Sequence, residues 1–154
     1  MSSLPISVED QGQTNWCWAA VGAAISNFRR STSYRPCDVA TLFLKAPKCC
    51  GEPGIWNKSA ELSAVLQQLD LLRASKPALE LDELAVELQA RPVAARIVFF
   101  GNGLVHFVLI TGCSPDGRVV VQDPSGPAQY DLSMAEMTFS YPSGGVWRES
   151  YLVI

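Results

Sequence analysis

The sequence is poor in histidine, in clustered basic residues and in long hydrophobic runs. One histidine, His106, occurs in 154 residues. Lysine and arginine total 12 against 15 aspartates and glutamates, so the net charge is −3. Phosphate binding requires a basic surface, which excludes nucleic acid as the main partner. The longest apolar stretch, residues 97–110, is broken by Gly-Asn-Gly and therefore predicts strands rather than a membrane span.

A secretory signal is also lacking. The first ten residues, MSSLPISVED, contain neither a charged leader nor an apolar core. We therefore expect a protein that is cytoplasmic or is exported by a signal-independent secretion system. In such a chain, reduced cysteines are the default state.

The five cysteines do not form a recognisable metal motif. Their odd number leaves at least one thiol free if the others pair. No CxxC pair occurs, and adjacent cysteines are poor ligands of one tetrahedral ion, so we predict no metal and no cofactor. A disulfide between Cys37 and either Cys49 or Cys50 is expected if the protein is exported, and buried free thiols if it is not.

The order of the predicted elements indicates an α+β protein. Hydrophobic residues make up 48% and charged residues 18% of the chain, which is typical of one globular domain spanning residues 1–154. We expect an N-terminal helical half over about residues 1–91 and a C-terminal antiparallel sheet over about 92–154. The predicted helices are 16–30, 37–45, 59–72, 80–90 and 130–137, and the predicted strands are 92–100, 106–112, 118–124 and 146–154.

The stretch QGQTNWCWAA places Cys17 in the first turn of a predicted helix that Thr14 or Asn15 caps. Free N–H groups and the helix dipole at such a position stabilise a thiolate, which is the nucleophilic form of cysteine. The alternative is a buried core cysteine, the common fate of this residue type.

A nucleophilic thiol requires a base, and His106 is the one imidazole in the chain. Residues 106–124 predict a hairpin. If its loop is Cys113–Asp116, Asp123 lies opposite His106 on the same face and orients the ring through Nδ1. A two-residue loop at Asp116-Gly117 would instead place Pro127 opposite the histidine.

Each of these residues also has an ordinary interpretation. His106 fits a core histidine on an apolar strand, and Asp123 fits a turn aspartate before a proline. For acyl transfer, donors must face the developing oxyanion. The Cys17 backbone N–H and the Gln11 side chain are the candidates, Gln13 is a rival, and a solvated loop glutamine is the alternative for both. We expect Trp16 to line the cleft and contact substrate and Trp18 to pack in the core, with core packing as the ordinary alternative for Trp16 as well.

Together these residues resemble the active-site segments of papain-like cysteine peptidases. The order Gln11, Cys17, His106 and Asp123 matches that family, as does the tryptophan directly after the cysteine. The similarity is greatest to small bacterial members, including effector and toxin proteases. Two features differ from papain: Thr14-Asn15-Trp16 replaces its Gly-Ser-Cys stretch, and an aspartate replaces its asparagine.

The resemblance implies a helical lobe carrying the cysteine, packed on a sheet that carries the histidine, with the cleft between them. It implies hydrolysis of peptide or amide bonds by a Cys-His-Asp thiolate mechanism, with a protein or peptide substrate. A cognate inhibitor or a secretion partner would be further partners, and Trp147 would shield the His106–Asp123 hydrogen bond from water.

The same triad also supports other reactions. Deamidation, transglutamination and cell-wall amide cleavage all use it, and the sequence does not separate them from peptide hydrolysis. An inactive binding module that retains the fold is the alternative from a different functional class.

Overall fold

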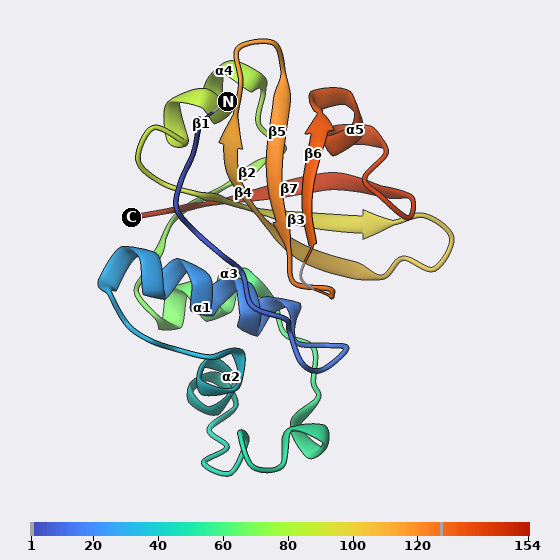
Figure 1. Cartoon of the computed structure of the whole chain (residues 1–154). Coiled ribbons are helices and arrows are strands. Elements are labelled where there is room, and N and C mark those ends of the chain that lie inside the picture. Colours follow the sequence, from blue (N-terminus) through green and yellow to red (C-terminus); the bar gives the residue numbers. More distant parts are fainter. Residues whose placement is uncertain (1, 127) are drawn as a thin grey trace.

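The computed structural model describes residues 2–126 and 128–154. The first three α-helices of the chain pack together on one side of a seven-stranded antiparallel sheet (Figure 1). The helices are α1 (Cys17–Arg30), α2 (Pro36–Leu44), α3 (Leu62–Gln68), α4 (Leu81–Glu87) and α5 (Met134–Phe139), with a short 3₁₀ helix η1 (Pro53–Trp56). The strands are β1 (Ser2–Ser3), β2 (Leu72–Pro77), β3 (Val93–Phe99), β4 (Val105–Cys113), β5 (Arg118–Asp123), β6 (Ala128–Ser133) and β7 (Gly145–Val153).

The strand order is β2-β7-β3-β4-β5-β6, and β1 pairs with β4. Side chains of a strand point alternately to the two faces of a sheet. Along β4, Phe107 and Leu109 join the hydrophobic cluster around α1, whereas Val108 and Ile110 join a second cluster on the other face. The sheet therefore separates two cores, and β4 contributes to both.

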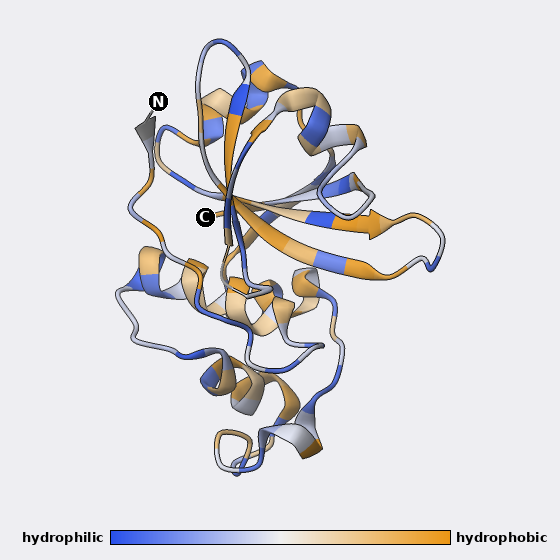
Figure 2. Ribbon diagram, turned by 45° about the vertical axis from the view of Figure 1, so that its right-hand side comes forward, coloured by the Kyte–Doolittle hydropathy of each residue, from blue (hydrophilic) through white to orange (hydrophobic). Residues whose placement is uncertain are grey.

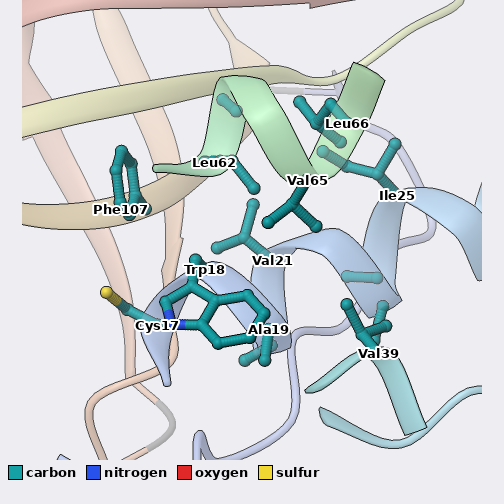
Figure 3. Packing of buried hydrophobic residues seen from close by; sticks show 14 of the residues in the cluster. Cys17, Trp18, Ala19, Val21, Ile25, Val39, Leu62, Val65, Leu66 and Phe107 are labelled. Carbon is teal, nitrogen blue, oxygen red and sulfur yellow. The ribbon is translucent and has the colours of Figure 1, made fainter. Parts of the chain in front are cut away.

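Helix α1 lies at the centre of the first core. Every residue from Cys17 to Ser26 is buried, and most are small or apolar (Figures 2 and 3). A Cβ added at Gly22 would lie 3.5 Å from Cγ1 of both Val39 and Val65, so α2 and α3 approach the backbone of α1 closely at this position. The small side chains thus allow one helix to be packed on all sides.

Two predicted helix starts differ from the structure. Helix α1 has Trp16 at its N-cap, and no side chain caps it. Thr14 and Asn15 were the predicted caps, but both hydrogen-bond with Asn57 instead. Helix α3 begins at Leu62 rather than Ser59.

The sheet also includes residues that were predicted to be helical or were not assigned to any helix or strand. Helix α3 ends at Gln68, and Asp70 adopts a left-handed conformation with φ 55° before β2 begins. Strand β2 lies within residues 1–91, for which only helices were predicted, and it pairs with β7. Strand β6 was missed, and it pairs with β5 along its whole length. The partner of β2 lies far along the chain, whereas β6 forms a hairpin with the strand that precedes it.

Within the described parts of the chain, no helix combines the length and apolar character that crossing a bilayer requires.

Candidate active site

Cys17 is the first residue of α1, where the backbone N–H groups of the first turn have no partners within the helix. The residue is 6% exposed, and its sulfur points away from the packed cluster (Figure 3). A thiol at this end of the helix is therefore placed at the surface of the core, where it can reach a second group.

The loop after η1 fixes the start of this helix. Trp16 Nε1 donates to the carbonyl oxygen of Trp56 at 2.9 Å, and Trp18 Nε1 donates to that of Lys58 at 2.9 Å. The backbone N–H of Asn15 donates to Asn57 Oδ1 at 2.9 Å. The two tryptophans that flank the cysteine thus serve as hydrogen-bonding anchors that hold its backbone in place.

His106 and Asp123 meet at the ends of their strands. His106 Nε2 lies 2.7 Å from Asp123 Oδ1, near the start of β4 and at the last residue of β5. The predicted contact therefore exists. The predicted ring nitrogen was wrong, because Nε2 rather than Nδ1 faces the carboxylate. Nδ1 is the ring nitrogen that remains for Cys17.

The predicted hairpin register was also wrong. Leu109 pairs with Gln122, and a β-bulge then shifts the pairing so that Gly112 faces Val120. The pairs next to the loop, Gly112–Val120 and Cys113–Val119, match neither loop considered from the sequence, and the bulge then shifts the pairing by one further residue. The ladder stops before His106, and its side chain reaches Asp123 beyond the last paired residues.

Asp123 is 5% exposed and has a hydrogen-bond donor on each carboxylate oxygen. Oδ1 accepts from His106 and from the Ser125 backbone N–H at 2.8 Å, and Oδ2 accepts from the Tyr141 hydroxyl at 2.6 Å. Burial raises the pKa of this carboxyl, but the hydrogen bonds and the charge of His106 outweigh burial and lower the pKa below its ordinary value. Asp123 is therefore ionised at neutral pH.

The His106 imidazole is held in its protonated form. Burial lowers its pKa, but hydrogen bonds to Asp123 and Cys17, together with their negative charges, raise it to about 9. The side chains of Cys17 and Asp123 thus act on the same ring from different elements, α1 and β5. This is the arrangement that a thiolate–imidazolium pair requires.

Gln11 lies close to this group but uses its amide within its own turn. Its backbone N–H donates to the Pro124 carbonyl at 3.0 Å, which ties the turn to the end of β5. Its Nε2 donates to the carbonyl oxygens of Gln13 and Thr14, both at 2.9 Å. Among the described residues, its buried Oε1 has no hydrogen-bond partner.

A cavity of about 650 Å³ opens beside the three groups. Cys17, His106 and Asp123 all line it. Its other walls come from the segments around α1, α3, the β3–β4 hairpin and the turn after α5, with Asn15, Glu61, Phe99, Leu104, Tyr130 and Tyr141 among the lining residues.

Two tryptophans do not have the positions expected of them. Trp16 was predicted to line the cleft, but it packs in the core with 2% of its surface exposed and does not line the cavity. Trp18 lines the cavity instead. Trp147 packs in the second core with its Nε1 bonded to the Glu149 carbonyl. The aromatic ring beside His106 is that of Phe99, with centroids 6.2 Å apart.

Sequence reasoning missed Phe99 and Tyr141. Phe99 is the last residue of β3 and lies within the predicted strand 92–100, and nothing in its local sequence marks it as a site residue. Tyr141 precedes the turn Pro-Ser-Gly-Gly and lies 18 residues from Asp123. Only the tertiary contact between them indicates its importance.

The remaining cysteines lie away from the cavity. Cys37 and Cys50 form a disulfide, one of the two pairings predicted for an exported protein. Cys37, Asp38 and Cys50 gather potential metal ligands, but the two sulfurs are bonded to each other. Burial raises the pKa of the free thiols Cys49 and Cys113. Both are therefore protonated at neutral pH.

Comparison with known proteins gives one family and one fold. The sequence model of the family described as "Papain-like cysteine protease AvrRpt2" matches residues 1–141. No curated protein matches the chain. Among solved structures, the peptidase domain of Streptococcus ComA, a bi-functional ABC transporter involved in a quorum sensing pathway, superposes with a TM-score of 0.61 at 14% identity. The match covers 96% of this chain and 97% of that domain.

Proposed function

The chain belongs to the family of papain-like cysteine proteases that AvrRpt2 represents, and on that premise we propose that Cys17, His106 and Asp123 form its catalytic triad. The family and the shared fold confirm the predicted papain-like α+β architecture and the predicted enzyme class, a cysteine protease. The observation that carries the triad is the position of His106, which interacts with both the Cys17 thiol and the Asp123 carboxylate.

In the proposed mechanism, the Cys17 thiolate attacks the carbonyl carbon of a peptide bond, and the carbonyl oxygen becomes an oxyanion. The His106 imidazolium then gives its Nδ1 proton to the leaving amine as the C–N bond breaks, which leaves a thioester on Cys17. Neutral His106 next removes a proton from water, and the resulting hydroxide displaces the thiolate. Asp123 keeps the ring oriented through Nε2 in every step.

The oxyanion requires donors at the start of α1. The Cys17 backbone N–H is one, because first-turn N–H groups have no partner within the helix. We propose Gln11 as the other. Its backbone bond to Pro124 places the side chain next to the site, and one of its two bonds to carbonyls of its own turn would be exchanged for the oxyanion.

A protease acts on a protein substrate, and the resemblance to small bacterial members supports a role as an effector or toxin. A cognate inhibitor or a secretion partner would then be expected. Mass spectrometry of a host-cell lysate treated with the chain would test this role and the reaction type together. New protein N-termini would indicate peptide hydrolysis, whereas modified glutamines in uncleaved proteins would indicate deamidation or transglutamination.

Iodoacetamide labelling tests the ion pair without knowledge of the substrate. We expect Cys17 to be alkylated at a pH below about 7, where a thiol with the ordinary pKa of about 8.5 reacts slowly. The charge of His106 stabilises the thiolate, so His106→Ala should abolish this low-pH reaction. Peptide mapping would measure the extent of labelling at each cysteine.

Cys49 and Cys113 are internal controls for this labelling, because burial raises the pKa of both thiols. Equal and slow labelling of all three cysteines would contradict the ion pair and would favour the inactive binding module.

The pH dependence of turnover provides a second test. The pKa of His106 is raised to about 9, so the imidazolium that protonates the leaving amine is lost as pH rises through that value. We expect kcat/KM to fall on the alkaline side with a midpoint near pH 9, measured with a peptide substrate whose own groups do not titrate there. A midpoint near the ordinary imidazole pKa would show that Cys17 and Asp123 do not hold the proton on His106.

A further inference from the structure

Tyr141 makes the one hydrogen bond to Asp123 Oδ2 among the described residues. Its hydroxyl donates to that oxygen at 2.6 Å and the residue is 2% exposed, so water does not compete for the carboxylate there. Oδ1 is already shared between His106 and the Ser125 backbone. Without the tyrosine hydroxyl, Oδ2 of this buried carboxylate would have no donor, and only the two bonds on Oδ1 would oppose rotation about the Cβ–Cγ bond.

We infer that Tyr141 is a positioning residue of the protease, which fixes the Asp123 carboxylate through Oδ2 so that Oδ1 stays against His106 Nε2. The inference rests on the proposed triad and adds a fourth member that does not touch the reacting atoms. The chain of contacts is Tyr141 to Asp123, Asp123 to His106, and His106 to Cys17.

The backbone around Tyr141 is built as a tight support for this ring. Tyr141 and Gly145 exchange backbone hydrogen bonds at 2.9 and 3.0 Å, which closes the turn between α5 and β7. Ser143 and Gly144 within it adopt positive φ values of 76° and 90°. A Cβ at Gly145 would collide with the Ile97 side chain, so the turn lies directly against β3. The position of the tyrosine is therefore determined by the sheet.

Neighbouring aromatic rings restrict the tyrosine further. Tyr130 of β6 meets the Tyr141 ring edge to face, with centroids 5.9 Å apart at 88°. Phe99 of β3 contacts it from another side, with centroids 6.5 Å apart, and the same Phe99 lies beside His106. A ring confined in this way loses little further freedom when its hydroxyl binds Asp123, so the hydrogen bond can be both short and permanent.

Tyr141→Phe tests the inference, because it removes the hydroxyl and keeps the ring. We expect kcat to fall between roughly 10- and 100-fold, the cost of a misplaced catalytic group, with KM within about twofold of the wild-type value. The matched control is Tyr151→Phe, another buried tyrosine that packs on the opposite face of the sheet. A merely structural role would predict similar, small changes in both variants.

Two further readouts separate positioning from packing. In the Asp123→Asn background, Tyr141→Phe should cost nothing further in kcat, because it acts only through that carboxylate. The chain has one histidine, so ¹⁵N NMR of the imidazole reports on this site alone. The ¹⁵N chemical shifts of His106, followed against pH, should show an inflection at acid pH where Asp123 becomes protonated. This inflection should move to higher pH in Tyr141→Phe, because the ionised Asp123 carboxylate loses a hydrogen-bond donor.

Additive losses of kcat, or an unmoved inflection, would overturn the inference. If Tyr141→Phe does not fold, wild-type protein made with fluorinated tyrosine can be used in its place. The fluorinated phenol is more acidic and therefore a stronger hydrogen-bond donor, so the inflection should move to lower pH. No movement of the inflection would overturn the inference. The NMR readout does not require turnover. An inactive wild-type chain with a shifted inflection would therefore refute the proposed function and leave the Tyr141–Asp123–His106 arrangement standing.

Discussion

Replacing Cys17 with alanine should reduce kcat by roughly 10⁴-fold or more while the protein remains folded. In the proposed mechanism the Cys17 thiolate forms the covalent bond to the substrate, and no other side chain of the described cavity wall is a thiol. The side chain packs at the edge of the core, so its loss should lower the free energy of unfolding by only about 1 kcal/mol. Cleavage of a fluorogenic peptide that the wild-type chain hydrolyses measures the first effect, and thermal unfolding measures the second.

Cys113→Ala is the matched control for this variant. Cys113 is a partly exposed free thiol at the far end of β4, away from the cavity, and its removal should leave kcat unchanged. Substantial turnover by a folded Cys17→Ala protein would show that the nucleophile is a different group or an activated water.

Replacing His106 with alanine should have a comparable effect on kcat, again roughly 10⁴-fold. The variant loses the proton donor for the leaving amine and also the charge that stabilises the thiolate. Low concentrations of free imidazole should restore part of the rate by entering the space that the ring vacates. Such rescue would show that the variant has lost the imidazole group and has not misfolded.

His106→Ala also has a distinct effect on stability. Asp123 would keep its bonds to Tyr141 and Ser125 but lose the partner whose charge lowers its pKa, so that pKa should rise. A folded carboxyl with a lowered pKa contributes stability above its unfolded value, and this contribution is lost as pH falls through the folded value. The variant should therefore lose stability relative to the wild type at neutral pH and approach it at acid pH. Equal differences at both pH values would contradict the assigned ion pair.

Local pattern was sufficient to predict much of the fold. The apolar composition of α1 predicted a buried helix, and the Val- and Ile-rich stretches predicted β3, β4, β5 and β7. Strands β2 and β6 were missed because their sequences, LRASKP and AQYDLS, are polar and have weak strand propensity. Strand β2 forms because it pairs with the distant β7, and β6 forms because it pairs with β5 in a hairpin, so backbone pairing rather than side-chain propensity decides both.

The proximity of Cys17, His106 and Asp123 was predictable from the sequence, but the geometry of their contacts was not. A cysteine at a helix start and a single histidine left few choices for nucleophile and base. The hairpin register could not be foreseen, because its loop differs from both loops that the sequence suggested and because β4 contains a bulge. Trp16 was assigned to the cleft because it adjoins Cys17, but its Nε1 bond to the Trp56 carbonyl turns it into the core. Neither the loop after η1 nor Tyr141 has a sequence spacing that identifies its partner.

The order of the site residues along the chain determines when they can meet during synthesis. Strands β3, β4, β5 and β6 are neighbours in the sheet without β7, so the contacts among His106, Asp123 and Tyr141 require the chain only up to Tyr141. Cys17 is made many seconds earlier at a translation rate of roughly 5–20 residues per second. Throughout that interval the nascent chain carries a thiol without an oriented base. The proposed nucleophile therefore meets its proposed base only after most of the chain has been made.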